Sequence, residues 1–371
     1  MSYLGESTKK LGFGLMRLPM NGEKVDIEQT KKMVDYFMDN GFTYFDTAYV
    51  YINGISEVAM KEALVERYPR DSYQTATKLP LHSLKTAEDM PPYFEESLKR
   101  AGLEYFDFYL LHAISKDSYA TTEKVGAWDY LKKLKTEGRI KHMGFSFHDS
   151  AELLDKILTE HPETEFVQLQ INYADWEDDN VQSRKCYEVA RKHDVPVIIM
   201  EPVKGGSLAA MSPKVQDIFK KANPDMSVAS WAMRFAASLE GVITVLSGMS
   251  DEAQMIDNCT VLKDLKPLTD SEKAAINEVV EILNNTPTIP CTDCKYCVDD
   301  CPQKINIPSI ISNINSYMLY DNLAGAKGSY GFSTKDRGLA SDCIACGECE
   351  SRCPQHLEII EHMKKAAELF E

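Results

Sequence analysis

Eight cysteines stand in two identical runs near the end of the chain. The first run is Cys291, Cys294, Cys297 and Cys301, followed by Pro302, and the second is Cys343, Cys346, Cys349 and Cys353, followed by Pro354. Both runs therefore read C-x2-C-x2-C-x3-C-P. Three thiolates on one tight loop can bind three irons of a cubic cluster, and the proline stops a helix from forming through the loop. The spacing predicts two 4Fe-4S clusters and one-electron chemistry.

The two runs resemble those of bacterial two-cluster ferredoxins, in which the fourth cysteine of each run binds the other cluster. This resemblance implies one cluster on Cys291, Cys294, Cys297 and Cys353, and a second on Cys343, Cys346, Cys349 and Cys301. Paired C-x2-C knuckles could also bind zinc. Zinc, however, would need neither the third cysteine of each run nor the repeated C-P ending.

Disulfides are the least favoured use of these thiols. The chain shows no secretory signal, and no stretch approaches the ~20 apolar residues of a membrane span. We therefore expect a cytoplasmic location, where thiols stay reduced. The net charge is −16, and the basic residues form no arm or stripe. Nucleic acids and anionic membranes are consequently poor partners.

The elements that precede the cysteines alternate between strand and helix. Eight short β-rich runs are expected at Leu11–Met16, Thr43–Thr47, Tyr73–Thr77, Phe106–Leu111, Ile140–Ser146, Phe166–Gln170, Pro196–Met200 and Val242–Leu246. Amphipathic helical runs lie between them at Ile27–Asn40, Ser56–Tyr68, Pro91–Ala101, Glu123–Glu137, Ser150–Glu160, Val181–His193, Ser227–Leu239 and Asp251–Leu262.

Eight strand–helix units in about 250 residues predict an α/β fold, a (β/α)8 TIM barrel. A doubly wound sheet is the alternative. It would need a glycine-rich dinucleotide fingerprint after an early strand, and Gly12-Phe13-Gly14 lacks the third glycine. We expect the barrel over residues 1–265, a helix and linker over 266–290, and a ferredoxin-like domain over 291–371.

Chemistry in such barrels occurs at the C-terminal ends of the strands. Asp46 and Tyr51 follow the second expected strand, Lys78 the third and His112 the fourth. Consecutive strands are neighbours in a barrel, so these four side chains should meet at its mouth. A strand-end Asp or His is often only a capping residue, and Lys78 with Asp46 could be a structural ion pair.

The four positions resemble the catalytic tetrad of the aldo-keto reductases, and the whole chain resembles a ferredoxin-type branch of that family. Asp46-Thr47-Ala48 with Tyr51 is similar to the family's D-T-A-x-x-Y signature. The resemblance implies an NAD(P)H-dependent oxidoreductase that interconverts a carbonyl and an alcohol. Tyr51 would be the acid/base, Lys78 would lower the pKa of the phenol, Asp46 would hold Lys78, and His112 would orient the substrate.

The resemblance also implies a nicotinamide site. Its residues would be Ser146, Gln168 with Asn172, Ser247, Gly248 and Met249, and then Gln254 and Asn258. Separately, the backbone amides of Lys204, Gly205 and Gly206, before Ser207, could cradle a pyrophosphate, and the alternative is a plain flexible loop. Three positions depart from the family pattern: Phe147 stands in place of Asn, Met200 in place of an aromatic residue, and Ser250-Asp251-Glu252 in place of basic residues. Carboxylates repel a 2′-phosphate, which weakens the case for NADP over NAD.

Beyond the barrel, Leu265–Asn285 and the proline-flanked stretch up to Pro290 predict a helix and a stiff linker. Helices are expected at Ile307–Leu323 and Leu357–Phe370, in a mainly helical two-cluster domain. Gly325–Gly338 is glycine-rich and is expected to be a mobile loop. The loops Leu79–Met90 and Ile114–Thr122 are expected to form the pocket wall.

Nicotinamide transfers two electrons as hydride, whereas each cluster takes one, and the sequence has no flavin signature. Three interpretations therefore compete. The barrel is a reductase whose clusters exchange electrons with a ferredoxin or flavodoxin, or the clusters are structural or redox-sensing. In the third, the chain is an electron-transfer or partner-docking protein whose barrel has lost hydride chemistry.

Overall fold

The structure is a computed structural model that describes residues 4–291, 293–298, 301–353 and 355–371. Pro354, the proline of the second cysteine motif, lies outside the described residues. The described chain divides into two compact units. The first takes in residues 4–202 and Ser230–Leu268, and the second Val203–Ala229 and Thr269–Glu371.

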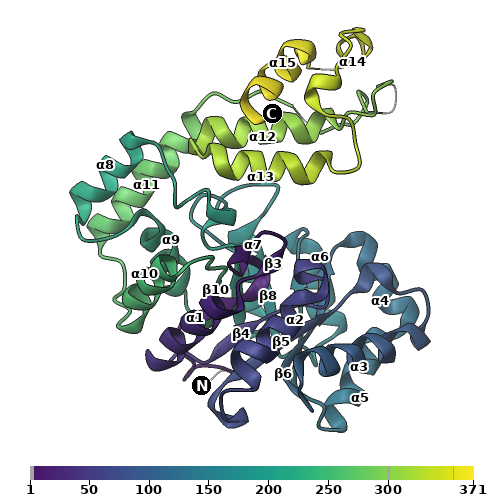
Figure 1. Ribbon diagram of the computed structural model, residues 1–371, viewed down its shortest axis with the longest axis vertical. Helices are drawn as coiled ribbons and strands as arrows, with labels where there is room; N and C mark the ends of the chain where they lie inside the picture. Colours follow the sequence, from purple (N-terminus) through teal and green to yellow (C-terminus); the bar gives the residue numbers. More distant parts are fainter. Residues whose placement is uncertain (1–3, 292, 299–300, 354) are drawn as a thin grey trace. The chain divides into compact units, whose positions relative to one another are not determined.

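The first unit is a closed barrel of eight parallel strands (Figure 1). Around the barrel they lie in the order β1 (Leu11–Gly14), β10 (Val242–Ser247), β9 (Val197–Met200), β8 (Phe166–Gln170), β7 (Ile140–Phe147), β6 (Phe106–Ile114), β5 (Gln74–Leu79) and β4 (Tyr44–Asp46). A two-stranded antiparallel ribbon, β2 (Met20–Asn21) with β3 (Lys24–Val25), follows the first strand. The barrel predicted from strand–helix alternation is confirmed.

Large side chains fill the inside of the barrel. Tyr44, Phe108, Phe166 and Ile198 belong to one buried cluster from β4, β6, β8 and β9, and the rings of Tyr44 and Phe108 meet edge to face 5.0 Å apart. Buried side chains from alternating strands are the usual packing of such a barrel. The interior is therefore a solid core that fixes the strand ends rather than a pore.

Helices surround the strands. They are α1 (Ile27–Asp39), α2 (Ile55–Met60), α3 (Met90–Ala101), α4 (Lys116–Val125), α5 (Ala127–Thr136), α6 (Ala151–Glu160), α7 (Ser183–Lys192), α9 (Val228–Ala237) and α10 (Glu252–Lys263). A π-helical turn, Lys61–Val65, continues α2. In α1, the Asp26 side chain caps the first turn by accepting from Gln29 N, and Met33, Val34 and Phe37 form the buried face.

Two expectations for this unit are wrong. The single helix expected at Glu123–Glu137 is two helices, because Gly126 adopts φ +68 and ends α4 before α5 begins. The segment Ile114–Thr122 is not a loop either, because β6 extends to Ile114 and α4 already starts at Lys116. A left-handed residue cannot continue a right-handed helix, and glycine adopts this conformation at least cost.

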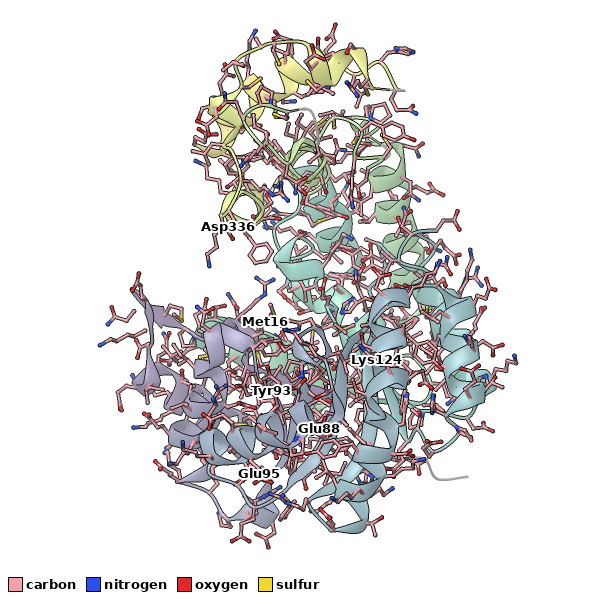
Figure 2. All side chains as sticks on the ribbon, turned by 90° about the vertical axis from the view of Figure 1, so that its right-hand side faces the viewer. Met16, Glu88, Tyr93, Glu95, Lys124 and Asp336 are labelled. Carbon is pink, nitrogen blue, oxygen red and sulfur yellow. The ribbon has the colours of Figure 1, made fainter. Side chains whose placement is uncertain are left out.

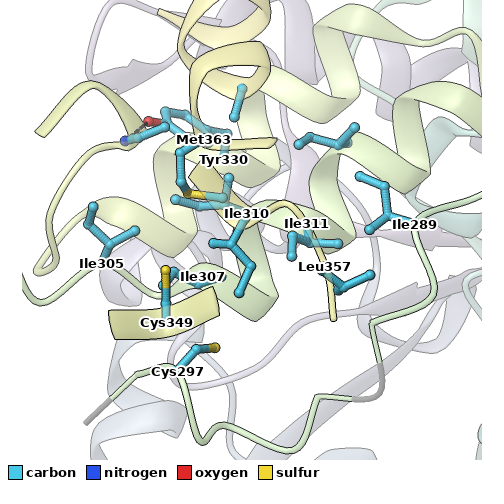
Figure 3. Packing of buried hydrophobic residues seen from close by; sticks show 14 of the residues in the cluster. Ile289, Cys297, Ile305, Ile307, Ile310, Ile311, Tyr330, Cys349, Leu357 and Met363 are labelled. Atoms are coloured by element: carbon cyan, nitrogen blue, oxygen red, sulfur yellow. Dashed lines mark hydrogen bonds between the residues drawn. The ribbon is translucent and has the colours of Figure 1, made fainter. Parts of the chain in front are cut away.

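The second unit is mainly helical. It contains α8 (Pro213–Ala222), α11 (Asp270–Asn285), α12 (Ile307–Tyr320), α13 (Leu323–Thr334), α14 (Glu348–Ser351) and α15 (Ile359–Phe370). Its core gathers side chains from α12, α13 and α15 together with cysteines of both runs (Figure 3). Ile310, Ile314 and Met363 are fully buried there. No described helix is long and apolar enough to cross a membrane.

The glycine-rich segment 325–338 is not the mobile loop that its composition suggests. Most of it is helical, as the C-terminal part of α13. The Asn322 side chain caps this helix by accepting from Gly325 N at 2.9 Å. Ala326, Tyr330 and Thr334, four residues apart, bury one face, and α13 packs against α12. Tertiary packing and a good N-cap outweigh the low helix propensity of glycine.

Candidate active site

Four residues from three neighbouring strands meet at one end of the barrel. Asp46 is the last residue of β4, Lys78 lies in β5, and His112 lies near the end of β6. Strand β5 pairs with β4 on one side and with β6 on the other, with Asp46 opposite Ala76 and Lys78 opposite Leu110. Tyr51 begins the 3-10 turn Tyr51–Gly54 that follows β4. Parallel pairing thus brings all four to the C-terminal edge of the barrel.

Lys78 and Asp46 form a buried ion pair. The Lys78 Nζ donates to Asp46 Oδ1 at 2.5 Å and to the carbonyl oxygen of Thr47 at 2.7 Å. Their side chains are only 1% and 3% exposed. A buried ammonium needs such partners, because an unpaired charge in this environment would be costly. The two acceptors therefore fix the position of the charge.

Tyr51 lies directly beside that charge. The Lys78 Nζ is 4.8 Å from the centre of the Tyr51 ring, and the rings of Tyr51 and His112 meet edge to face at 5.8 Å. Both rings are half-buried, so a small molecule can reach them. The structure brings together all four residues that the sequence suggested for acid–base chemistry.

The surroundings set the protonation states of this group. Burial opposes the charge of Lys78, but Asp46 and Tyr51 raise the pKa of Lys78 above its ordinary value. Burial also raises the pKa of Tyr51; Lys78 opposes this shift and Asp46 adds to it. The net direction for the phenol is thus the reverse of the lowering expected from Lys78 alone. Burial, with Lys78 next, lowers the pKa of His112 to about 3, so its ring is neutral near pH 7.

Two of the residues suggested for the nicotinamide, Ser146 and Gln168, lie opposite each other on the paired strands β7 and β8. Ser146 Oγ accepts a hydrogen bond from Ala113 N at 2.8 Å, which holds it beside the residue after His112. Gln168 is buried, and its Oε1 has no hydrogen-bond partner in the part of the chain that the structure describes. An orphaned buried acceptor at this edge fits a ligand that carries N–H groups, such as a carboxamide.

Asn172 serves the protein instead. Its Nδ2 donates to Asp175 Oδ2 at 2.8 Å, and its Oδ1 accepts from Asp175 N at 2.9 Å. It also donates to the carbonyl oxygen of Glu201 at 3.2 Å. These bonds use the amide to fix the loop after β8.

The segment after β10 is tied to the start of α10. Ser247 Oγ accepts from Asn258 at 3.0 Å, and Gln254 Oε1 accepts from Ser250 N at 2.9 Å. Asp251 caps α10 by accepting from Gln254 N at 2.8 Å. Met249 is fully buried. The Asp251 carboxylate is thus engaged by its own helix.

Arg17, which the sequence reasoning missed, lies against this segment. A Cβ built on Gly248 would stand 3.2 Å from Arg17 Cδ, and Ser250 Oγ donates to the Arg17 carbonyl oxygen at 2.9 Å. Arg17 follows Met16, an exposed residue labelled in Figure 2. Arg17 is an exposed residue and has no carboxylate partner among residues 4–291, 293–298, 301–353 and 355–371. This contact joins Arg17 and Gly248, which are 231 positions apart in the sequence, so no local sequence pattern indicates it.

Lys204, Gly205 and Gly206 form a 3-10 turn in which Lys204 has φ 48 and Gly205 has φ 63. They belong to the second unit. Their left-handed residues turn the chain a few residues after β9 ends at Met200.

The eight motif cysteines line two small cavities of the second unit. One is lined by Cys291, Cys294, Cys297 and Cys353, with Ile307, Ile311, Leu357 and Ile359 among its other walls. The second is lined by Cys301, Cys343, Cys346 and Cys349, with Ile305, Ile307 and Met363. Each cavity thus takes three cysteines from one run and the fourth from the other.

The donor set of each cavity suits an iron–sulfur cluster. Four thiols with apolar walls provide the ligands and the shielding that a cluster needs. A single zinc ion would need its sulfur ligands about 2.3 Å from one point. In the described parts of the chain, no three His, Cys, Asp or Glu side chains converge so closely. Cys186 and Cys259, outside both motifs, are buried.

Two family models match successive parts of this chain. Residues 10–281 match the model of the Aldo/keto reductase family, and residues 290–358 that of the 4Fe-4S dicluster domain. The chain is 27% identical over 281 residues to the 9,11-endoperoxide prostaglandin H2 reductase of Trypanosoma cruzi, covering 73% of this chain and 88% of that protein. It is 33% identical over 181 residues to the probable aldo-keto reductase 1 of Glycine max, a match that spans only 46% of this chain and 50% of that protein.

Solved structures show the same fold. An aldo-keto reductase from Klebsiella pneumoniae in complex with NADPH aligns with a TM-score of 0.58 at 22% identity, over 74% of this chain and 91% of that one. A holo aldo-keto reductase from Bacillus halodurans aligns with a TM-score of 0.60 at 23% identity, over 75% and 95%. The chain therefore belongs to the aldo/keto reductase family of NAD(P)-dependent oxidoreductases, and it carries a 4Fe-4S dicluster domain C-terminal to its barrel.

Proposed function

We propose that the barrel interconverts a carbonyl and an alcohol with NAD(P)H, and that Tyr51 is its acid/base. One observation carries this proposal: Tyr51 lies 4.8 Å from an ammonium that is held in place by a buried carboxylate. A lone surface tyrosine would have no such neighbour. The arrangement gives a phenol that is protonated near pH 7 and a fixed positive charge for the phenolate that remains after proton transfer.

Each side chain then has a defined task. Bound nicotinamide supplies or accepts the hydride. The neutral His112 ring donates an N–H to the carbonyl oxygen and orients it toward Tyr51. Tyr51 gives its proton to that oxygen as negative charge develops, and Lys78 stabilises the phenolate. Asp46 holds Lys78, while Gln168 and Ser146 would hold the carboxamide of the nicotinamide.

Arg17 supports binding of a nucleotide phosphate beside Gly248. The expectation of weak NADP selectivity was based on the carboxylates of Asp251 and Glu252. Asp251, however, accepts hydrogen bonds from Gln254, and Glu252 has Lys32 3.9 Å away. A free guanidinium against the same segment can supply the missing positive charge for a phosphate. We therefore propose NADP rather than NAD as the preferred nucleotide.

We propose two 4Fe-4S clusters within residues 291–371, one for each set of four cysteines. The first set is Cys291, Cys294, Cys297 and Cys353, and the second is Cys301, Cys343, Cys346 and Cys349. Such clusters carry single electrons, and a ferredoxin or flavodoxin is the class of partner that would exchange them in a cytoplasmic setting. The cysteines of each set, with the apolar walls around them, would hold the cluster and shield it from water.

The test is Tyr51→Phe in the full chain, purified without oxygen. We expect loss of NADPH-dependent reduction of an activated aromatic aldehyde by at least about 100-fold, since general acid catalysis contributes at this level. Tyr36→Phe, an exposed tyrosine on α1, serves as the matched control. Cluster absorbance should be equal in all three proteins. Retained turnover in Tyr51→Phe would favour the electron-transfer interpretation instead.

A second measurement addresses the clusters. Stoichiometric NADPH is added without substrate, and the nicotinamide absorbance at ~340 nm and the EPR spectrum are followed. NADPH gives two electrons at once and each cluster accepts one, so reduction of the clusters would require a further group, such as a flavin, that accepts a pair and passes the electrons on singly. Oxidised clusters with bound NADPH are the expected result, and they direct the search toward an external electron carrier.

A further inference from the structure

The segment that carries Tyr51 has an unusual backbone. Directly after Tyr51, Ile52 has φ 49, Asn53 has φ 53 and Gly54 has φ 85, so three consecutive residues are left-handed. Left-handed conformations are unfavourable for residues other than glycine, and most of all for a β-branched residue such as Ile52. Such a turn persists only when its surroundings hold it.

One side chain of α3 contacts both sides of this turn. Arg100 Nη1 donates to the carbonyl oxygen of Tyr49 at 3.2 Å, and Nη2 donates to the Tyr49 hydroxyl at 3.2 Å. Its guanidinium lies 4.1 Å from the centre of the Tyr49 ring. On the far side of Tyr51, a Cβ built on Gly54 would stand only 2.9 Å from Arg100 Nη1. In the sequence, Tyr51 therefore lies between Tyr49 and Gly54, and both of these residues lie against the Arg100 guanidinium.

Helix α3 supports this contact further. Tyr93, labelled in Figure 2, meets the ring of Tyr49 edge to face at 4.8 Å. The Nε of Arg100 donates to Glu96 at 3.1 Å, one turn earlier on the same helix. Arg100 is thus fixed on its own helix, and both Arg100 and Tyr93 of that helix contact the Tyr49 ring.

Arg100 is also connected to the strand that carries Lys78. Its Nη1 lies 3.6 Å from Glu57 Oε2, and the Glu57 side chain is fully buried. Glu57 Oε1 accepts a hydrogen bond from Thr77 Oγ1 at 2.7 Å. Thr77 directly precedes Lys78 in β5, so its side chain faces the helices while Lys78 faces the barrel mouth. Burial raises the pKa of Glu57, while hydrogen bonds and then Arg100 favour its charged form.

We infer that Arg100, supported by Glu57, is a positioning residue that sets the distance between Tyr51 and Lys78. Thr77, Glu57 and Arg100 connect the backbone beside Lys78 to the backbone on both sides of Tyr51. Arg100 contacts Tyr49, Gly54, Glu57 and Glu96, none of which is assigned to the reacting atoms or to nicotinamide binding. This inference rests on the proposed role of Tyr51 as the acid/base and adds the element that keeps the phenol within reach of the ammonium.

The experiment compares Arg100→Met and Arg100→Lys with the parent chain. The control is Arg139→Met, because Arg139 also contacts α3: it pairs with Glu95 and lies 4.9 Å from the Phe94 ring. We expect kcat to fall by about 30-fold or more in Arg100→Met, since small misplacements of reacting groups cost rates of this order. The Kd for NADPH should change by less than about 3-fold, because Arg100 lies away from the nucleotide segment.

The pH dependence gives a readout that general destabilisation would not move. A looser turn takes Tyr51 away from Lys78, so the alkaline limb of kcat should shift to higher pH in Arg100→Met and stay in place in Arg139→Met. Arg100→Lys should recover less than half of the lost kcat, because an ammonium cannot reproduce the two parallel donors to Tyr49. Glu57→Gln should lower kcat in the same direction, and it replaces Arg100→Met as the test if that variant does not fold.

Two outcomes separate the inference from the function on which it rests. If Tyr51→Phe abolishes turnover while kcat of Arg100→Met stays within about 2-fold of the parent, the positioning role is wrong and the acid/base role stands. If Tyr51→Phe itself retains turnover, the acid/base role of Tyr51 is wrong, and the positioning role that rests on it is wrong as well. An equal loss of kcat in Arg139→Met would also overturn the inference, because it would assign the effect to α3 as a whole.

Discussion

Replacement of Lys78 by methionine isolates the electrostatic part of the proposed mechanism. The ammonium lies 4.8 Å from the centre of the Tyr51 ring. At that separation and an effective dielectric constant of about 20, its attraction for a phenolate is about 3.5 kcal/mol. This corresponds to about 2.5 pKa units, and we expect kcat to fall by up to about 300-fold. The alkaline limb of the pH profile should move upward by a similar number of units.

The single change also leaves Asp46 buried without its partner, which costs about 3–5 kcal/mol of stability. The assay therefore includes Lys78→Met with Asp46→Asn, a neutral pair of similar shape that should recover the thermal stability but not the rate. Turnover is measured with NADPH and an aromatic aldehyde in proteins matched for iron content. A Lys78→Met protein that binds NADPH and keeps its rate within about 3-fold would refute the assigned role of the charge.

Four further outcomes are expected. Because the pKa of His112 is lowered to about 3, carbonyl reduction should show no limb near the ordinary histidine pKa of 6.5, and a limb there that disappears in His112→Gln would contradict a neutral ring. Arg17→Met should weaken NADPH binding at least about 10-fold and NADH binding less than about 2-fold in fluorescence titrations, whereas Lys133→Met, at an exposed position of α5, should affect neither by more than about 2-fold. Cys353→Ser should lower the iron content from about eight to about four atoms and remove one EPR signal only, and loss of both signals would argue against the assigned ligand sets. Asp107 is 3% exposed and accepts hydrogen bonds from Arg70 at 2.7 Å and from Thr75 N at 2.9 Å. Asp107→Asn should therefore lower the free energy of unfolding in urea by about 3 kcal/mol and leave kcat unchanged. An unchanged unfolding midpoint would show that these hydrogen bonds contribute little to stability.

Much of the barrel could be predicted because its signals are local. Each strand is a short β-rich run whose ends are marked by polar residues, and the bounds of β8 were predicted to the residue at Phe166–Gln170. The strand ends then indicate which residues stand at the mouth, since neighbouring strands in sequence are neighbours in the barrel. Asp46, Lys78 and His112 could be grouped on this basis alone.

Elements whose formation depends on partners could not be predicted. Helix α13 contains three glycines, and it forms because Asn322 caps it and Tyr330 packs in the domain core. The break at Gly126 was missed because the apolar periodicity of the neighbouring helices continues across it. Composition reports average tendencies, and one cap or one left-handed residue is enough to reverse them.

The sequence by itself determined the residue types and their order around the barrel. It placed a tyrosine, a lysine, an aspartate and a histidine at consecutive strand ends, and it set two cysteine runs at a cluster-binding spacing. Those conclusions need only the periodicity of strands and the chemistry of side chains.

Only the tertiary structure decided the environment of those residues. Closure of the barrel buries Lys78 and Asp46, and the burial of Tyr51 itself raises the pKa of its phenol, although Lys78 acts to lower it. Folding also brings Arg100 to Tyr49, just before the Tyr51 turn, and Arg17 to Gly248, across 51 and 231 positions of sequence. Burial and long-range contact depend on how distant segments pack, and the sequence of either segment alone does not contain that information.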